Sequence, residues 1–306
     1  MMNRDQYLAQ VELLLDCLPA LKEQEIFALK GGTAINFFIR DLPRLSVDID
    51  LTFLKLESRK NAIKEIESGL IALGGEIIKR NKKFQIRELK TKEGELHKLI
   101  IATGATQIKI EPNFIMRGTL FPTRKMDIAK AVEDKFEYSI KQIPVLSEEE
   151  IFAGKICAAL SRQHPRDFFD IQVLFENQGI TDGIRQAFVI YLLCSPRPIH
   201  ELLRPNLIAL NNIFENEFIN MTEKPVSLAA LLNVREKLIK MINQRLSNSE
   251  RDFILSVKKG DPDYSLMPFD HLEDLPALKW KLLNIRNMDK EKHQAMLKKL
   301  TVVLEG

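Results

Sequence analysis

Two carboxylates, Asp48 and Asp50, stand one residue apart in the segment VDIDLTF. Val47, Ile49 and Leu51 alternate with them, so in a β-strand both carboxylates leave one face while the apolar side chains face the core. Like charges about 6 to 7 Å apart along a strand repel each other unless a cation lies between them. Mg²⁺ binds one or two carboxylates together with waters and phosphate oxygens. The pair therefore indicates phosphoryl or nucleotidyl transfer, with a solvated strand edge as the alternative.

A pair of glycines precedes this segment. Gly31 and Gly32 follow the short run FALK and come before AINFFI, which predicts the order strand, turn, helix. Backbone N–H groups at the start of a helix can bind a phosphate, and Thr33 adds a hydroxyl at the same turn. Such turns also occur in many loops, but together with the paired aspartates this turn favours a nucleotide site.

The glycine turn followed by R-x-S-x-D-x-D, here Arg44, Ser46, Asp48 and Asp50, resembles the AbiEii/AbiGii toxin family of minimal nucleotidyltransferases, which includes the MenT toxins that add nucleotides to tRNA. The resemblance implies an α+β fold, in which a polymerase-β-like nucleotidyltransferase core with a mixed sheet flanked by helices is followed by a helical C-terminal domain. It also implies a set of nucleotide-binding residues in the turn and the motif: Gly31, Gly32, Thr33 and Ser46.

A third acid is expected on a later strand in this family. In ATQIKIEPNF the alternation of polar and apolar residues puts Glu111 on the polar face of such a strand. By the resemblance we assign Glu111 as the general base or as a third metal ligand beside Asp48 and Asp50. Two departures from the wider nucleotidyltransferase pattern are a threonine, Thr33, in place of the common serine and a glutamate in place of the common third aspartate.

The block LSEEEIFAGKICAALSRQHPRDFFDIQVLFE resembles a downstream block of the family. Ser147 and Glu150 form an S-x-x-E capping box that predicts a helix start. Lys155 and Arg162 are seven residues apart, two helical turns, so both cations lie along one face. By the resemblance, Lys155 is a phosphate ligand or stabilises transition-state charge, and Arg162 joins the nucleotide site.

Pro165 marks the start of a second helix in this block. Asp167 and Asp170 share a face of it at i and i+3. The resemblance makes Asp167 a catalytic candidate, either orienting Lys155 or acting as an additional acid, and leaves Asp170 structural. The alternative is a helical hairpin with ordinary surface ion pairs, such as Arg166 with Asp170.

The periodicity of the first half mixes strands and helices, and the second half is mostly helical in period. We expect a nucleotidyltransferase core over residues 1–178 and a helical domain over 179–306. The expected helices cover residues 4–18, 33–39, 59–73, 184–194, 200–218, 227–246 and 275–304. The expected strands lie near residue 27, at the paired aspartates, across 76–90 and 96–102, around residue 111, and within 125–143.

Length and composition agree with an enzyme of this kind. The 306 residues are enough for two domains. No run of eighteen apolar residues and no apolar N-terminal leader is present, which predicts a cytoplasmic protein without a membrane span. The three cysteines are widely spaced among apolar residues and the five histidines are scattered. This predicts buried reduced thiols and argues against a zinc site.

A basic stretch, KRNKKFQIRELKTK, holds seven Lys and Arg residues against one acid. Because the net charge is only +3, this local concentration says more about an RNA partner than the total does. The stretch could hold an RNA phosphate backbone. It could equally be a solvated hairpin whose lysines discourage pairing of sheet edges. Trp280, flanked by lysines, is expected to pack rather than to stack on a base.

The function that these features predict is Mg²⁺-dependent transfer of NMP from an NTP to an RNA acceptor, with the tRNA 3′ end first, which would block translation. By analogy with the family, a cognate DNA-binding antitoxin is expected as a partner. Two alternatives stay open. One is transfer to a protein or a small molecule, and the other is a catalytically silent binding module of the same fold.

Overall fold

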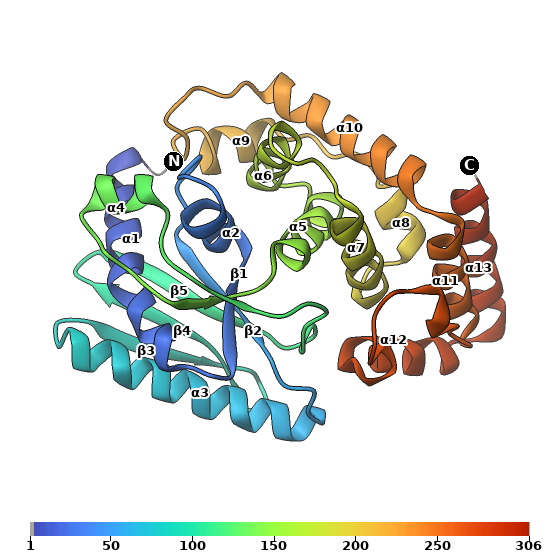
Figure 1. Ribbon diagram of the computed structural model, residues 1–306, viewed down its shortest axis with the longest axis horizontal. Helices are drawn as coiled ribbons and strands as arrows, with labels where there is room; N and C mark the ends of the chain where they lie inside the picture. Colours follow the sequence, from blue (N-terminus) through green and yellow to red (C-terminus); the bar gives the residue numbers. More distant parts are fainter. Residues whose placement is uncertain (1–2, 306) are drawn as a thin grey trace. The chain divides into compact units, whose positions relative to one another are not determined.

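The computed structural model describes residues 3–305, and the chain forms two compact units (Figure 1). The first unit is Met1–Ile151 together with Glu215–Pro225, and the second is Phe152–Phe214 together with Val226–Gly306. The ends of the two predicted domains, residues 1, 2 and 306, lie outside the described part of the chain.

A seven-stranded mixed sheet organises the first unit, in the order β3-β4-β5-β2-β1-β7-β6. β2 pairs in parallel with β5, β1 pairs in parallel with β7, and the other neighbours are antiparallel. The elements are α1 Arg4–Cys17, η1 Leu18–Glu23, β1 Phe27–Lys30, α2 Gly31–Ala34, η2 Ile35–Ile39, β2 Asp48–Phe53, α3 Arg59–Arg80, β3 Gln85–Lys90, β4 Leu96–Thr103, β5 Thr106–Asn113, β6 Arg124–Met126, α4 Lys130–Phe136 and β7 Ile143–Val145. The expected α+β core is confirmed.

The two faces of this sheet differ in polarity because its strands alternate apolar and polar residues. Ile49 and Ile110 are buried neighbours in β2 and β5, and α3 runs along the sheet (Figure 1). A Cβ at Gly74 of α3 would lie 3.2 Å from Ile86 and 3.6 Å from Leu99, so α3 covers the apolar face closely. The acids expected at the site lie on the opposite face.

The helix α3 extends further than its sequence pattern indicates. We expected a helix over residues 59–73 and a strand over 76–90, but α3 continues to Arg80 and β3 begins only at Gln85. The expected strand is therefore wrong over residues 76–84. The helical period continues past the Gly74–Gly75 pair because Leu73 and Ile77 are fully buried on the same face.

Helices alone form the regular structure of the second unit over its described residues. Its elements are α5 Glu148–Arg162, whose first turn belongs to the first unit, α6 Pro165–Glu176, α7 Asp182–Cys194, α8 Ile199–Leu203, α9 Asn211–Glu217, whose last three residues belong to the first unit, α10 Leu228–Arg245, α11 Asn248–Lys259, η3 Tyr264–Leu266, η4 Leu272–Asp274, α12 Pro276–Arg286 and α13 Lys290–Glu305.

Two long helices expected in this half are interrupted. The helix expected over 200–218 is divided into α8 and α9, because Pro205 has no backbone N–H and disfavours helix at the residue before it. The helix expected over 275–304 is divided into α12 and α13, with Asn287 as the C-cap of α12. Apolar periodicity alone does not reveal such breaks.

The division into units differs from the boundary that we expected after residue 178. α6 packs against α10, so the downstream block joins the second unit, which begins at Phe152. Residues 215–225 return to the first unit. There the backbone N–H of Leu45 donates to the Met221 carbonyl at 2.8 Å, and Arg44 forms an isolated β-bridge with Thr222.

The three cysteines are free thiols. Cys17 and Cys194 are buried and Cys157 is half-buried. Burial raises the pKa of Cys194 to about 12, so this thiol stays protonated and unreactive near neutral pH. The three cysteines form no disulfide with one another, and Cys157 is less buried than we expected. In residues 3–305 no helix is both long and apolar enough to span a membrane.

Candidate active site

The register of the sheet brings Asp50 and Glu111 side by side. In the parallel pair of β2 and β5, Asp50 is aligned with Glu111 and Asp48 with Lys109. Because aligned residues of neighbouring strands point to the same face, all four side chains lie on the polar face of the sheet. The sequence predicted that each acid lies on the polar face of its own strand. The strand register shows that these polar faces are on the same side of the sheet.

The glycine turn lies against the carboxylate of Asp50. Gly31 has φ +74°, in the left-handed region, and a Cβ at this residue would lie 2.3 Å from Oδ2 of Asp50. A Cβ at Gly32 would lie 2.8 Å from the Arg44 guanidinium and 3.0 Å from the Ser46 hydroxyl. Both positions therefore need glycine, the first for conformation and for space.

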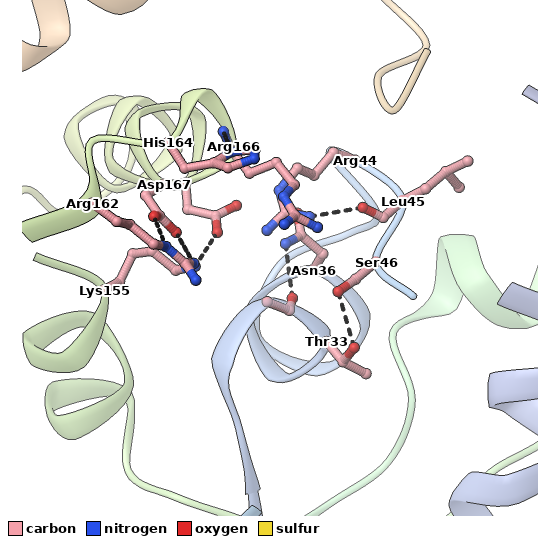
Figure 2. Close-up of polar contacts among 12 residues, drawn as sticks. Thr33, Asn36, Arg44, Leu45, Ser46, Lys155, Arg162, His164, Arg166 and Asp167 are labelled. Atoms are coloured by element: carbon pink, nitrogen blue, oxygen red, sulfur yellow. Dashed lines mark hydrogen bonds and ion pairs between the residues drawn. The ribbon is translucent and has the colours of Figure 1, made fainter. Parts of the chain in front are cut away.

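Two hydroxyls hold the turn against β2. Oγ1 of Thr33 lies 2.6 Å from the Asp48 carbonyl and 3.0 Å from the hydroxyl of Ser46, as Figure 2 shows for the second contact. Because a carbonyl only accepts, Thr33 donates to it, and Ser46 donates to Thr33. Thr33 is fully buried. Its hydroxyl thus positions the Asp48 strand, which leaves the backbone N–H groups of the turn as its donors for phosphate.

Three basic residues of the first unit were given no role in the site from the sequence. Lys98 of β4 forms an ion pair with Glu111. Lys30, the last residue of β1, is the cross-strand neighbour of Asp50. Arg44 is 3% exposed and donates to the Leu45 carbonyl at 2.8 Å. Two of these residues could have been found from the sequence. Lys30 directly precedes the glycine pair, and Arg44 begins the R-x-S-x-D-x-D motif.

The set of Asp48, Asp50 and Glu111 as metal ligands stays a prediction. In residues 3–305, the side chains as they lie form no group of three His, Cys, Asp or Glu residues that could hold a metal ion. Glu111 forms an ion pair with Lys98 of β4. Asp48 and Asp50 remain a two-carboxylate pair of hard oxygen donors, and two suffice for Mg²⁺.

The second group of expected site residues belongs to the second unit. Lys155 lies 2.9 Å from Oδ1 of Asp167 and 2.9 Å from Oδ2 of Asp170, and all three side chains are buried. Arg162 donates to both oxygens of Asp167, at 2.6 and 2.8 Å. Figure 2 shows the Lys155, Arg162 and Asp167 side chains joined in this way. The expected pairing of Lys155 with Asp167 is confirmed, as is the shared face of Asp167 and Asp170.

The charges of this cluster are balanced internally. Burial alone would raise the pKa of Asp167, but Lys155 and Arg162 outweigh burial and hold the pKa of this carboxyl well below its usual range. Lys155 contacts two carboxylates and is 6% exposed, whereas the Arg162 side chain is 57% exposed. Arg162 is therefore the cation of this cluster that a ligand can reach.

The start of α6 is held by the residue before Pro165. Nδ1 of His164 accepts from the backbone N–H of Arg166 at 3.1 Å, which makes His164 the N-cap. Pro165 at the first helical position fits because its missing N–H would have no helical partner there. This local geometry fixes where Asp167 emerges and explains its contact with Lys155 in α5.

The comparisons with known proteins agree with this geometry. Residues 12–284 match the family model described as "Nucleotidyl transferase AbiEii toxin, Type IV TA system". The nucleotidyltransferase toxin MenT4 from Mycobacterium tuberculosis H37Rv has a similar structure, with a TM-score of 0.56 and 16% identity over 99% of each chain. A terminal uridylyl transferase 4 from Trypanosoma brucei with bound dUTP matches with a TM-score of 0.29 and 12% identity over 99% of this chain and 93% of that one, too low to carry an argument. No curated protein matches.

The mixed seven-stranded sheet with its flanking helices is consistent with an α+β nucleotidyltransferase fold. The family match covers most of the chain, and the chain belongs to the AbiEii nucleotidyl transferase toxin family of type IV toxin–antitoxin systems. It is therefore an enzyme that takes an NTP as substrate, and its family implies an antitoxin partner. Nucleotidyltransferases of this kind generally use a divalent metal.

Proposed function

We propose that this nucleotidyltransferase transfers NMP from an NTP to an RNA acceptor, with the 3′ end of tRNA as the first candidate, and thereby blocks translation. The observation that carries the proposal is the alignment of Asp50 with Glu111 beside the turn at Gly31. It supplies acidic ligands, a base and phosphate donors on one face of the sheet. A cytoplasmic location and a DNA-binding antitoxin belong to the same proposal.

The metal in this proposal is Mg²⁺, held by Asp48 and Asp50. The residues fit it because both carboxylates leave the same strand face and because Gly31 leaves open the space beside Asp50 that a Cβ would fill. When bound, Mg²⁺ neutralises charge on the phosphates of the NTP. Lys98 forms an ion pair with Glu111 and orients its side chain on the neighbouring strand.

The chain's own residues serve the other parts of the reaction. Backbone N–H groups at Gly32 and Thr33 bind the phosphates of the NTP, and Ser46 fixes the turn through Thr33. Glu111 takes the proton of the acceptor hydroxyl as its oxygen forms a bond to the α-phosphorus. The bond from the α-phosphorus to the bridging oxygen then breaks, and pyrophosphate leaves with that oxygen.

The roles of Lys155, Arg162 and Asp167 are a separate proposal that rests on their chemistry. Arg162 is the exposed cation, so we propose that it contacts the triphosphate, while Asp167 orients it and Lys155 balances the buried carboxylates. Replacing Arg162 by Gln should then raise KM for the NTP about tenfold, with a smaller effect on kcat.

The experiment that tests the function measures incorporation of each α-labelled NTP into total RNA by the purified protein with Mg²⁺. Asp48→Asn should abolish the label. Asp134→Asn is the matched control, because it removes one exposed carboxylate of the same unit, paired with Lys130, and should leave the label unchanged.

Each outcome of this assay separates the proposal from its alternatives. A labelled tRNA-sized band that is absent with Asp48→Asn supports the proposal. Label in protein or in small molecules of a cell lysate, with none in RNA, would overturn the RNA acceptor. Unchanged label or unchanged growth inhibition with Asp48→Asn would overturn the role of the paired acids.

A further inference from the structure

A cavity of about 140 Å³ lies within the second unit, outside the groups described above. It is lined by the segment between α7 and α8 and by residues of α11, α12 and α13. Half of the lining residues are apolar, and the cationic and aromatic side chains among them are Arg197, His200, Lys258, Trp280 and Lys281. No Asp or Glu is among the described residues that line it.

Lys258 is the unusual residue of this cavity. It is 4% exposed, and its ammonium group has no hydrogen-bond or ion-pair partner within residues 3–305. Burial lowers the pKa of this group. A largely desolvated ammonium without a counter-charge is unfavourable, so an anion in the cavity would supply the partner that the protein does not.

Lys281 adds a second cation to the same cavity. Its Nζ donates to the Ser195 carbonyl at 2.8 Å, which uses one of its three N–H groups. Burial, with the nearby Lys258, lowers the pKa of Lys281 to about 8. His200 is flanked by Glu201, 4.0 Å away and 52% exposed on its side chain, and burial lowers the pKa of His200. The two lysines are thus the principal anion ligands.

Trp280 gives the cavity a stacking surface. It lines the cavity and is 47% exposed, so its indole ring is accessible and is not packed as we expected from the sequence. Aromatic rings next to a cationic groove bind single-stranded nucleic acids by stacking on a base while the cations hold the backbone. The space holds several water-sized groups, which suits a phosphate group and not a whole nucleotide.

We propose that this cavity is a second phosphate-binding site, which holds a backbone phosphate of the RNA acceptor while Trp280 stacks on a neighbouring base. The RNA part of this assignment rests on the proposed function, whereas the anion site does not. Lys258 and Lys281 contact the phosphate, and Arg197 contacts the strand at the exposed side.

The test uses the fluorescence of Trp280, the single tryptophan of the chain, in the full-length protein. Hexauridylate RNA, uridine and inorganic phosphate are titrated separately. Hexauridylate should quench the emission saturably and more weakly at higher salt, uridine should not, and inorganic phosphate should bind at least tenfold more weakly than the RNA.

Two variants connect the signal to the cavity. Lys258→Met should weaken hexauridylate binding about tenfold or more, because a charge-assisted hydrogen bond is lost. Lys279→Met is the matched control. It lies next to Trp280 but pairs with Asp274 at 3.0 Å and does not line the cavity, so its effect should be under twofold. Lys258→Met should melt no lower than wild type, since it removes an unpaired buried charge.

Three outcomes would overturn the proposal. They are no quenching by hexauridylate, equal binding by Lys258→Met and wild type, and inorganic phosphate binding as tightly as RNA, which would make the cavity a small-anion site. If quenching is absent while wild type still labels RNA, the second site fails and the proposed function stands. If hexauridylate quenches the emission but no RNA is labelled, the second site stands and the proposed function fails.

Discussion

Gly31 is the residue at which backbone conformation and site geometry meet. An alanine there would cost about 1 to 2 kcal/mol in the left-handed region, and its Cβ would displace the carboxylate of Asp50. We therefore expect Gly31→Ala to lower the free energy of unfolding modestly and to lower kcat/KM for labelled NTP by more than a hundredfold, measured by urea unfolding and steady-state incorporation.

Gly94 separates these two effects. It also has a positive φ, +86°, but a Cβ there meets nothing within 4 Å. Gly94→Ala should thus lower the free energy of unfolding by about as much as Gly31→Ala does, but it should keep the wild-type transferase activity. Equal loss of activity in both variants would mean that backbone strain, and not the approach to Asp50, is responsible.

At the scale of elements, the junction of α5 and α6 depends on a buried ion cluster. Asp167→Asn removes a carboxylate that Lys155 and Arg162 both contact, so the free energy of unfolding should fall by about 3 to 5 kcal/mol at pH 7. Because the folded pKa of Asp167 lies below the unfolded value, its contribution is complete above the unfolded pKa of about 3.9 and is lost as pH falls below it.

The difference between wild type and Asp167→Asn in urea unfolding should therefore stay constant from pH 7 to about pH 5 and narrow towards pH 3. Asp274→Asn is the control, because its carboxylate is half-exposed and pairs with Lys279. It should change stability by less than about 1 kcal/mol. A difference that widens on acidification would contradict the assignment of Asp167 as the ionised partner.

The edge strand β3 carries the basic stretch and allows a second test at this scale. Lys82 and Lys83 are exposed in the turn between α3 and β3. If they contact RNA phosphates, Lys82→Gln with Lys83→Gln should reduce the slope of log K against log salt for RNA binding by about 1 to 2.

Lys60→Gln with Lys64→Gln is the matched control, since it removes two exposed cations near the other end of α3. If the lysines of the basic stretch instead prevent pairing of sheet edges, the Lys82 and Lys83 variant should aggregate in light scattering while its RNA affinity is unchanged. The RNA-binding hypothesis and the edge-protection hypothesis therefore predict different results for the same Lys82 and Lys83 variant.

At the scale of the whole molecule, the chain leaves the first unit, forms part of the second, and returns through residues 215–225. Met221 is 1% exposed and its carbonyl accepts from Leu45. Met221→Ala should lower the free energy of unfolding by about 2 to 5 kcal/mol. Transferase activity should then be lost at a lower urea concentration than in wild type.

Trp280 reports on the second unit, so its fluorescence transition should move less than the loss of activity in Met221→Ala. Leu207→Ala, at a position 55% exposed in the second unit, should move neither transition by a comparable amount. Equal shifts of activity and Trp280 fluorescence in Met221→Ala would show that the two units unfold together.

The sequence alone determined the features that depend on local spacing. Alternation placed Asp48, Asp50 and Glu111 on polar strand faces, and the seven-residue spacing placed Lys155 and Arg162 on one face of a helix. Their contact with Asp167 joins two helices, and the sequence suggested it only through the family resemblance. The motif residues also led to the family. Apolar spacing did not locate the break after α8, which Pro205 causes. It also missed the break after α12 and the end of α3, where packing overrides a weak local preference.

Only the tertiary structure decided which distant residues meet. Strand register placed Glu111 beside Asp50 and allowed its ion pair with Lys98. The buried turn brought the hydroxyl of Thr33 to the carbonyl of Asp48, to which it donates a hydrogen bond. The return of residues 215–225 and the unpaired Lys258 in a cavity likewise have no local signature. The physical reason is that the period of a helix or strand determines which residues of that one element share a face. Register and packing bring together residues of different elements, and their separation in the sequence does not predict these contacts.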